Sequence, residues 1–157
     1  MFKLPVGVNI NNLIDDLRFL SWEASDILLY YSQILKNPSD SKKIIKNKNH
    51  EDPVTLADLK VNDLIIKGIN KKYKNVDWNI LSEENVKIEA NDVEIESQWV
   101  WVLDPLDGTK DFIQGTENYA MHLALNYEKK PHIGLVLIPK KNELWIADGK
   151  NTWCEKK

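Results

Sequence analysis

The chain has 157 residues, enough for one domain with a sizeable hydrophobic core. Hydrophobic residues make up 43% and charged residues 29%, as in globular proteins, and the net charge of −3 excludes a general attraction to nucleic acid. No apolar run reaches the length of a membrane span, and the N-terminus lacks the apolar core of a signal peptide. A lone cysteine, Cys154, cannot form an intramolecular disulfide. These features predict a cytoplasmic protein without a membrane segment.

Two helices are predicted in the first half of the chain. Residues 9–35 carry apolar side chains at helical spacing. A second helix is predicted to begin near Thr55 and to run to about Tyr73. The segment between them, residues 38–52, is polar and rich in lysine, which predicts a solvated loop.

From residue 79 onward the pattern changes to strands. A short strand at 79–81 precedes an acidic segment at 85–97, which is predicted to be a loop. Two helices followed by a strand meander predict an α+β fold, with the helices packed on one face of a largely antiparallel sheet. The later strands are predicted at 98–104, 119–127, 133–138, 143–148 and 151–154.

The sequence Asp-Pro-Leu-Asp-Gly-Thr at the end of a buried apolar run is the strongest chemical signal. Pro105 and Gly108 are expected to stop the strand and turn the backbone. Asp104, Asp107 and Thr109 then crowd around one strand end. Close carboxylates repel each other, and Mg²⁺, which prefers carboxylate and carbonyl oxygens, removes that cost. Because Asp, Pro and Gly are also turn residues, a bare turn of this composition leaves both interpretations open.

Two other acidic segments precede this one. Asp58 follows Thr55 by three residues, which is typical of a capping box at a helix start and also places a carboxylate there. Glu83 and Glu84 follow the strand at 79–81; paired acids usually form a solvated face, but their place after a strand favours a site. In this pair Glu84 is expected to support the site rather than to bind. His122 alternates with apolar neighbours, which favours a core or sheet-face histidine over a ligand.

Together the segments Asp52–Asp58, Leu81–Glu84 and Trp101–Phe112 resemble the signature of the lithium-sensitive, magnesium-dependent phosphatases related to inositol monophosphatase. Within that superfamily the chain is most similar to the CysQ-type 3'(2'),5'-bisphosphate nucleotidases. The resemblance continues from Trp99 to Trp153. It implies that residues 1–157 are the N-terminal, metal-binding half of an αβαβα sandwich. Family members carry a second half with a Trp-Asp motif and one more metal-binding aspartate, which this sequence lacks.

The resemblance also implies the metal site. It assigns Mg²⁺ binding to the carboxylates of Glu83, Asp104 and Asp107 and to the carbonyl of Leu106. Two metals about 3.5–4 Å apart can activate a water and stabilise the leaving oxygen of a phosphate ester. Asp104 would bridge the two ions.

The resemblance assigns the remaining roles to five residues. Thr109 and Asp58 would orient the attacking water and are the predicted catalytic pair. Asp107, Gly108 and Thr109 would contact the substrate phosphate, together with Lys48. For Lys48 the interpretation as a solvated loop residue competes with this role.

The substrate is indicated by Lys110-Asp111-Phe112, which is typical of the nucleotidases and favours hydrolysis of 3'-phosphoadenosine 5'-phosphate to AMP and phosphate. Departures from the family pattern at Asp52 and at Glu117-Asn118 weaken this prediction. The alternatives are an inositol or sugar phosphate phosphatase of the same superfamily, and a truncated remnant that binds metal or a partner without catalysis. The expected partners are a small phosphate ester, no nucleic acid polymer, and either a missing C-terminal half or a second copy through self-association.

Overall fold

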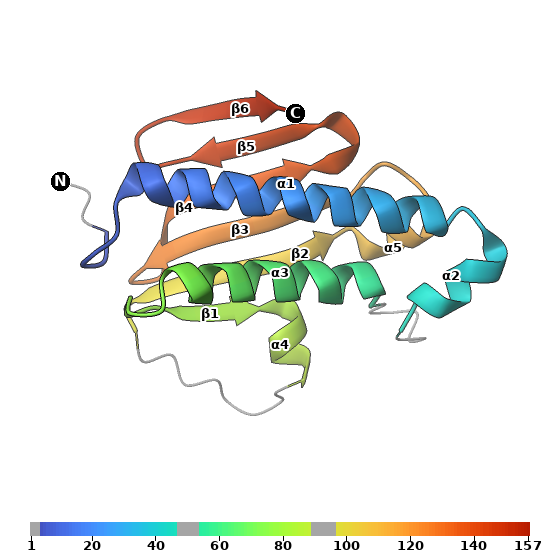
Figure 1. Ribbon diagram of the computed structural model, residues 1–157, viewed down its shortest axis with the longest axis horizontal. Helices are drawn as coiled ribbons and strands as arrows, with labels where there is room; N and C mark the ends of the chain where they lie inside the picture. Colours follow the sequence, from blue (N-terminus) through green and yellow to red (C-terminus); the bar gives the residue numbers. More distant parts are fainter. Residues whose placement is uncertain (1–3, 47–53, 89–96) are drawn as a thin grey trace.

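Residues 4–46, 54–88 and 97–157 are described by a computed structural model, in which six strands form one sheet covered on one face by the helices α1 and α3 (Figure 1). The strands follow chain order across the sheet; β1 pairs in parallel with β2, and the later neighbours are antiparallel. The predicted α+β class is therefore confirmed. The strands are β1 (Asn79–Ser82), β2 (Trp99–Asp107), β3 (Ala120–Tyr127), β4 (Lys130–Ile138), β5 (Glu143–Ala147) and β6 (Thr152–Lys156).

The long helix α1 spans Ile10–Ile34, in agreement with its apolar spacing. Asn9 caps it, because its side-chain oxygen accepts hydrogen bonds from the backbone N–H groups of Asn11 and Asn12 at 3.0 and 3.2 Å. The cap satisfies two N–H groups that have no partner within the helix.

The helix α3 spans Leu56–Lys72 and begins with the capping box that the spacing of Thr55 and Asp58 predicts. It lies beside α1 on the same face of the sheet (Figure 1). The two helices approach closely at Gly68, where an added Cβ would stand 2.5 Å from the side chain of Leu20.

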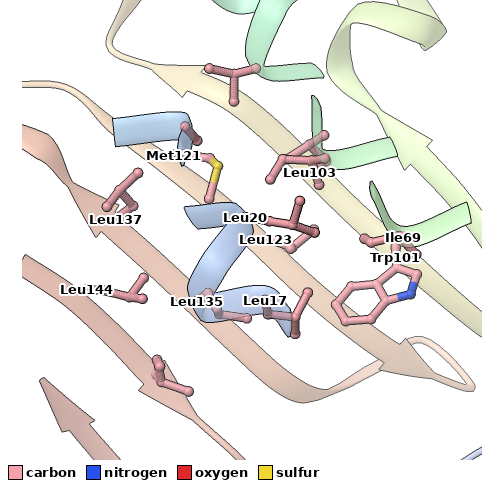
Figure 2. Packing of buried hydrophobic residues seen from close by; sticks show 14 of the residues in the cluster. Leu17, Leu20, Ile69, Trp101, Leu103, Met121, Leu123, Leu135, Leu137 and Leu144 are labelled. Carbon is pink, nitrogen blue, oxygen red and sulfur yellow. The ribbon is translucent and has the colours of Figure 1, made fainter. Parts of the chain in front are cut away.

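The core lies between these helices and the sheet. Side chains alternate along each strand, so that Trp101 and Leu103 of β2 are buried while Val102 between them is 38% exposed. Burial of each large apolar side chain stabilises the fold by roughly 1.5–3 kcal/mol. Figure 2 shows the interleaved side chains of Leu17, Leu20, Ile69, Trp101, Leu103, Met121, Leu123, Leu135, Leu137 and Leu144.

The loop predicted over residues 38–52 is wrong at its start, where the helix α2 spans Pro38–Ile44. The side-chain oxygen of Asn37 accepts a hydrogen bond from the N–H of Ser39 at 3.3 Å, and proline is well suited to the first turn of a helix. Asn37 therefore caps α2, which begins at Pro38 shortly after α1 ends at Ile34. The rest of the predicted loop, residues 47–53, lies outside the described part of the chain.

Two more short helices flank the acidic segments. The loop predicted over 85–97 begins as a helix, α4, at Glu83–Ile88, which the two acids in its first turn favour; residues 89–96 lie outside the described part. The helix α5 spans Thr109–Gln114 and was not predicted. Both helices have only six residues, too few to show a helical period in the sequence.

The strand β2 continues through Pro105 to Asp107, so the prediction that Pro105 ends it is wrong. The register with β3 shifts between Asp104 and Asp107. Such a bulge leaves residues out of the ladder, which accommodates a proline that has no N–H to donate.

Ion pairs attach the elements at the edges of the core. Arg18 of α1 donates two hydrogen bonds to the carboxylate of Glu155 on β6, at 2.6 and 2.8 Å. Asp16 of α1 accepts a hydrogen bond from the hydroxyl of Tyr73 at 2.7 Å and pairs with Lys72. Within the described ranges, no helix is both long and apolar enough to cross a bilayer.

Candidate active site

The site lies where the parallel strands β1 and β2 run side by side. Ser82, the last residue of β1, pairs with Leu103, so the next residues along the two strands, Glu83 and Asp104, come together. Their carboxyl groups interact through a side-chain hydrogen bond. Two of the three predicted acidic segments therefore meet at one strand end.

Among the acids of the site, Asp104 has the most strongly shifted pKa. Burial raises its pKa first, and the charge of Glu83, the hydrogen bond from Glu83 and the charge of Asp107 raise it further, to about 7. The backbone N–H of Leu106 opposes this by donating a hydrogen bond to Oδ1 of Asp104 at 3.1 Å. A cation beside Asp104 would relieve the repulsion that raises the pKa.

Asp107 lies at the outer side of the same strand end and is exposed. Its carboxylate oxygen Oδ2 is 3.9 Å from Nε2 of His122, which projects from the adjacent strand β3. His122 is also the cross-strand neighbour of Asp104. Of the two predicted positions for His122, core or sheet face, the structure shows the exposed sheet face, and sequence reasoning missed its place beside the acids. Alternation along the sequence indicates only that His122 lies on one face of a strand, whereas its pairing with Asp104 depends on the register of β3 against β2.

A chain of oxygen atoms leads from Leu106 to the start of α3. The hydroxyl of Thr109 donates a hydrogen bond to the carbonyl of Leu106 at 2.8 Å and lies 3.4 Å from Oδ1 of Asp58. Asp58 is 2% exposed, and burial raises its pKa against the hydrogen bonds that it accepts from Thr55 and Thr109. Asp58 is thus the capping residue that its motif predicts and also a neighbour of Thr109, and its catalytic role stays a prediction.

Gly108 makes the sharp turn between β2 and α5. Its φ angle is +81°, in the left-handed region that favours glycine. A Cβ atom there would stand 2.5 Å from the backbone carbonyl oxygen of Asn118. The turn that brings Thr109 back over Leu106 therefore requires glycine at this position.

Buried polar groups hold the first turn of α4 in place. The hydroxyl of Ser82 donates a hydrogen bond to the side-chain oxygen of Asn62 on α3, and the amide of Asn62 donates to Asn85 at 3.2 Å. Glu84 is 3% exposed, whereas Glu83 faces solvent. The division between a binding Glu83 and a supporting Glu84 stays a prediction.

The structure brings five of the predicted residues together at this strand end: Asp58, Glu83, Asp104, Leu106 and Thr109. Asp107 and Gly108 complete the same turn, whereas Lys48 lies outside the described residues and its role stays a prediction. In the described ranges no three acidic, histidine or cysteine side chains are gathered closely enough to hold a metal ion.

The donor set nevertheless suits Mg²⁺ in kind. Carboxylate and carbonyl oxygens are the ligands that this ion takes. The raised pKa of Asp104 marks a position where the protein crowds negative charge and a cation would compensate it. Glu83, Asp104 and Asp107, with the carbonyl of Leu106, are the residues that would hold it.

Known proteins share this architecture, in which helices cover one face of a sheet and an acidic turn follows one of its strands. The model of the Inositol monophosphatase family matches residues 17–157, and the chain belongs to that family.

Three similar proteins show how far the likeness extends. Nus factor SuhB of Pasteurella multocida is 35% identical over 100 residues, 64% of this chain and 35% of its own length. The 3'(2'),5'-bisphosphate nucleotidase CysQ of Escherichia coli is 30% identical over 145 residues, 91% of this chain and 54% of its own length. The crystal structure of suhB from Bartonella henselae superposes with a TM-score of 0.74 at 24% identity, over 93% of this chain and 53% of that one. The chain thus spans about half the length of these relatives or less.

Proposed function

We propose that this chain provides the metal-binding half of a Mg²⁺-dependent phosphatase that hydrolyses 3'(2'),5'-bisphosphate nucleotides, with 3'-phosphoadenosine 5'-phosphate as substrate and AMP and phosphate as products. The carrying observation is the convergence of Glu83 and Asp104, from two separate segments, at the strand end that also holds Asp107. Family membership and the similarity to CysQ over 91% of the chain support this function.

Bound Mg²⁺ would supply the positive charge that activates a water and stabilises the leaving oxygen. The residues of the chain would then divide the remaining work. Thr109, held by its hydrogen bond to the carbonyl of Leu106, can position a water through its hydroxyl oxygen. Asp58, whose pKa is raised by burial, lies 3.4 Å beyond it; if the Thr109 hydroxyl turns its single proton from Leu106 to Asp58, it can pass that proton to Asp58 while it takes one from the water.

The turn that leads into α5 is the proposed contact for the substrate phosphate. Gly108 leaves the backbone open there, and Asp107 and Thr109 flank it. These three residues are the proposed substrate contacts among the described residues, and Lys48 remains the fourth.

The choice of substrate rests on Lys110. Within Lys110-Asp111-Phe112, Phe112 is fully buried and packs edge-on against Tyr119 at 4.8 Å, so it belongs to the core. Asp111 accepts a hydrogen bond from the hydroxyl of Thr116 at 2.8 Å, which braces the end of α5. Lys110 alone is exposed and free to meet a second phosphate group.

The test is kcat/KM of the protein expressed from its complete natural reading frame, with 3'-phosphoadenosine 5'-phosphate and with inositol 1-phosphate. We expect preference for the bisphosphate, and we expect Lys110→Thr to reduce that preference about tenfold, as for one lost charge contact. Lys150→Thr, an exposed lysine in the β5–β6 turn, serves as the matched control. Equal or reversed preference in the unmodified protein would favour the alternative, an inositol or sugar phosphate phosphatase; no Mg²⁺-dependent turnover of either would favour the non-catalytic remnant.

A further inference from the structure

Asn62 connects the helix α3 to the segment that carries Glu83. Asn62 is 7% exposed, and Glu83 begins the helix α4 at the end of β1 (Figure 1). The side-chain oxygen of Asn62 accepts a hydrogen bond from the hydroxyl of Ser82, and its amide donates one to Oδ1 of Asn85 at 3.2 Å. These two partners stand on either side of Glu83 in the sequence, so Asn62 holds the chain both before and after this acid.

Glu83 depends on such support because its own segment is short. The strand β1 has four residues and α4 has six, and a helix of that length is not stable without tertiary contacts. Glu83 itself is exposed, so the core does not enclose its side chain. The position of its carboxylate relative to Asp104 is therefore set by where the backbone of α4 begins.

An amide is the side-chain group that this position requires. Ser82 is fully buried and Asn62 nearly so, and a buried polar group without a partner is costly. A carboxylate at position 62 could accept from Ser82 but could not donate to Asn85, and an aliphatic side chain could form neither bond. The asparagine amide makes both bonds at once.

The same side of α3 reaches the other half of the site. Asp58 precedes Asn62 by four residues, which places both side chains on one face of the helix. Asp58 is 2% exposed, and its Oδ1 lies 3.4 Å from the hydroxyl of Thr109. One turn of α3 therefore contacts both the turn that follows β2 and the start of α4, two segments that are separate along the chain.

We propose that Asn62 is a positioning residue for the metal site: it holds the start of α4 so that the carboxylate of Glu83 stays beside Asp104, and it thereby sets the affinity for Mg²⁺. This inference rests on the proposed function, in which Glu83 is a metal ligand. Asn62 acts through Glu83 and is not itself a ligand. Groups that hold a metal ligand in place typically contribute about 10–100-fold to the affinity for the ion.

The experiment is a titration with Mn²⁺, followed by electron paramagnetic resonance, of the protein expressed from its complete natural reading frame, since Mn²⁺ takes the same oxygen ligands. We expect Asn62→Ala to weaken binding about tenfold. In a Glu83→Gln background the same substitution should have no further effect, because the ligand through which Asn62 acts is already lost. Val61→Ala is the matched control. Val61 is a fully buried neighbour on α3, so this variant should lower stability through a cavity but leave the affinity unchanged.

Circular dichroism and thermal unfolding without metal show whether each variant is folded. If Asn62→Ala is not, Asn85→Ala removes one of the two hydrogen bonds and should still weaken Mn²⁺ binding about threefold. Three results would overturn the proposal while the metal site stands: unchanged affinity in Asn62→Ala, an equal loss in Val61→Ala, or the full further loss in the Glu83→Gln background. Mn²⁺ binding that does not depend on Glu83 would overturn the metal site of the proposed function, and this proposal with it.

Discussion

The Asp104→Asn variant tests the electrostatics of the site most sharply. The substitution removes the carboxylate that Glu83 and Asp107 repel, and it keeps the oxygen that accepts the hydrogen bond from Leu106. In the absence of Mg²⁺ we therefore expect the variant to be more stable than the unmodified chain at pH 8, although a substitution at a half-buried position usually destabilises. Mg²⁺ should stabilise the unmodified chain and have little effect on the variant.

The magnitude follows from the perturbed proton affinity. The pKa of Asp104 rises from 3.8 to about 7, and at about 1.4 kcal/mol for each tenfold change in proton affinity the full effect would be at most about 4 kcal/mol. Solvent screening of a half-buried group reduces this to roughly 1–2 kcal/mol. For a chain of this size that corresponds to about 3–6 °C in the midpoint of thermal unfolding.

The pH dependence has a defined sign. A carboxyl whose pKa is raised in the folded state binds protons more tightly there than in the unfolded chain, so it lowers stability as pH rises from about 4 to about 7. The difference between Asp104→Asn and the unmodified chain should therefore be small at pH 4 and largest above pH 7.

Thermal and urea unfolding at pH 4, 6 and 8, with and without Mg²⁺, would measure these effects. Asp63→Asn is the matched control, because Asp63 is an exposed acid of α3 paired with Lys67, and its loss should change stability by less than about 0.5 kcal/mol. A variant less stable than the unmodified chain at pH 8 without Mg²⁺, or one that keeps the full stabilisation by Mg²⁺, would refute the reasoning.

Three further predictions concern the turn, the α1–β6 attachment and the length of the chain. Gly108→Ala should cost about 1–3 kcal/mol and displace the turn, because the left-handed backbone and the carbonyl of Asn118 leave no room for a Cβ; unfolding within 0.5 kcal/mol of the unmodified chain would contradict this. Arg18→Ala should cost about 1–2 kcal/mol at pH 7, and since Arg18 lowers the pKa of Glu155, the difference should shrink as pH falls below about 4.5; a pH-independent difference would show that the ion pair is not its source. Residues 1–157 alone should release phosphate far more slowly than E. coli CysQ at saturating Mg²⁺, because the family resemblance places another metal-binding aspartate in a second half; comparable turnover would contradict it.

The elements that could be predicted from the sequence are those long enough to show a period. The helical spacing within residues 9–35 and the alternation around Trp101 and Leu103 correspond to α1 and β2 as observed. The short helices α2, α4 and α5 have six or seven residues, so capping by Asn37 and the positive φ of Gly108 determine them more than any repeat does. The prediction at Pro105 was wrong because β2 continues beyond it through a bulge, and the local sequence does not indicate that bulge.

The site was predictable to the extent that its residues are local. The turn from Asp104 to Thr109 lies in one segment, and its hydrogen bonds follow from that sequence. The approach of Glu83 to Asp104 depends on the parallel pairing of β1 with β2, and the place of His122 depends on the register of β3. Such long-range pairings are set by the packing of the whole sheet and leave no trace in either segment alone.

The central claim is that Glu83, Asp104 and Asp107 bind Mg²⁺ around the end of β2. A crystal structure with Mn²⁺, which takes the same oxygen ligands, tests it directly through anomalous scattering. The account predicts a peak within about 2.0–2.6 Å of carboxylate oxygens of Asp104 and of Glu83 or Asp107, the range of hard-cation bonds to oxygen. A peak bound by other residues, or none at this strand end when Mn²⁺ is saturating, would contradict it.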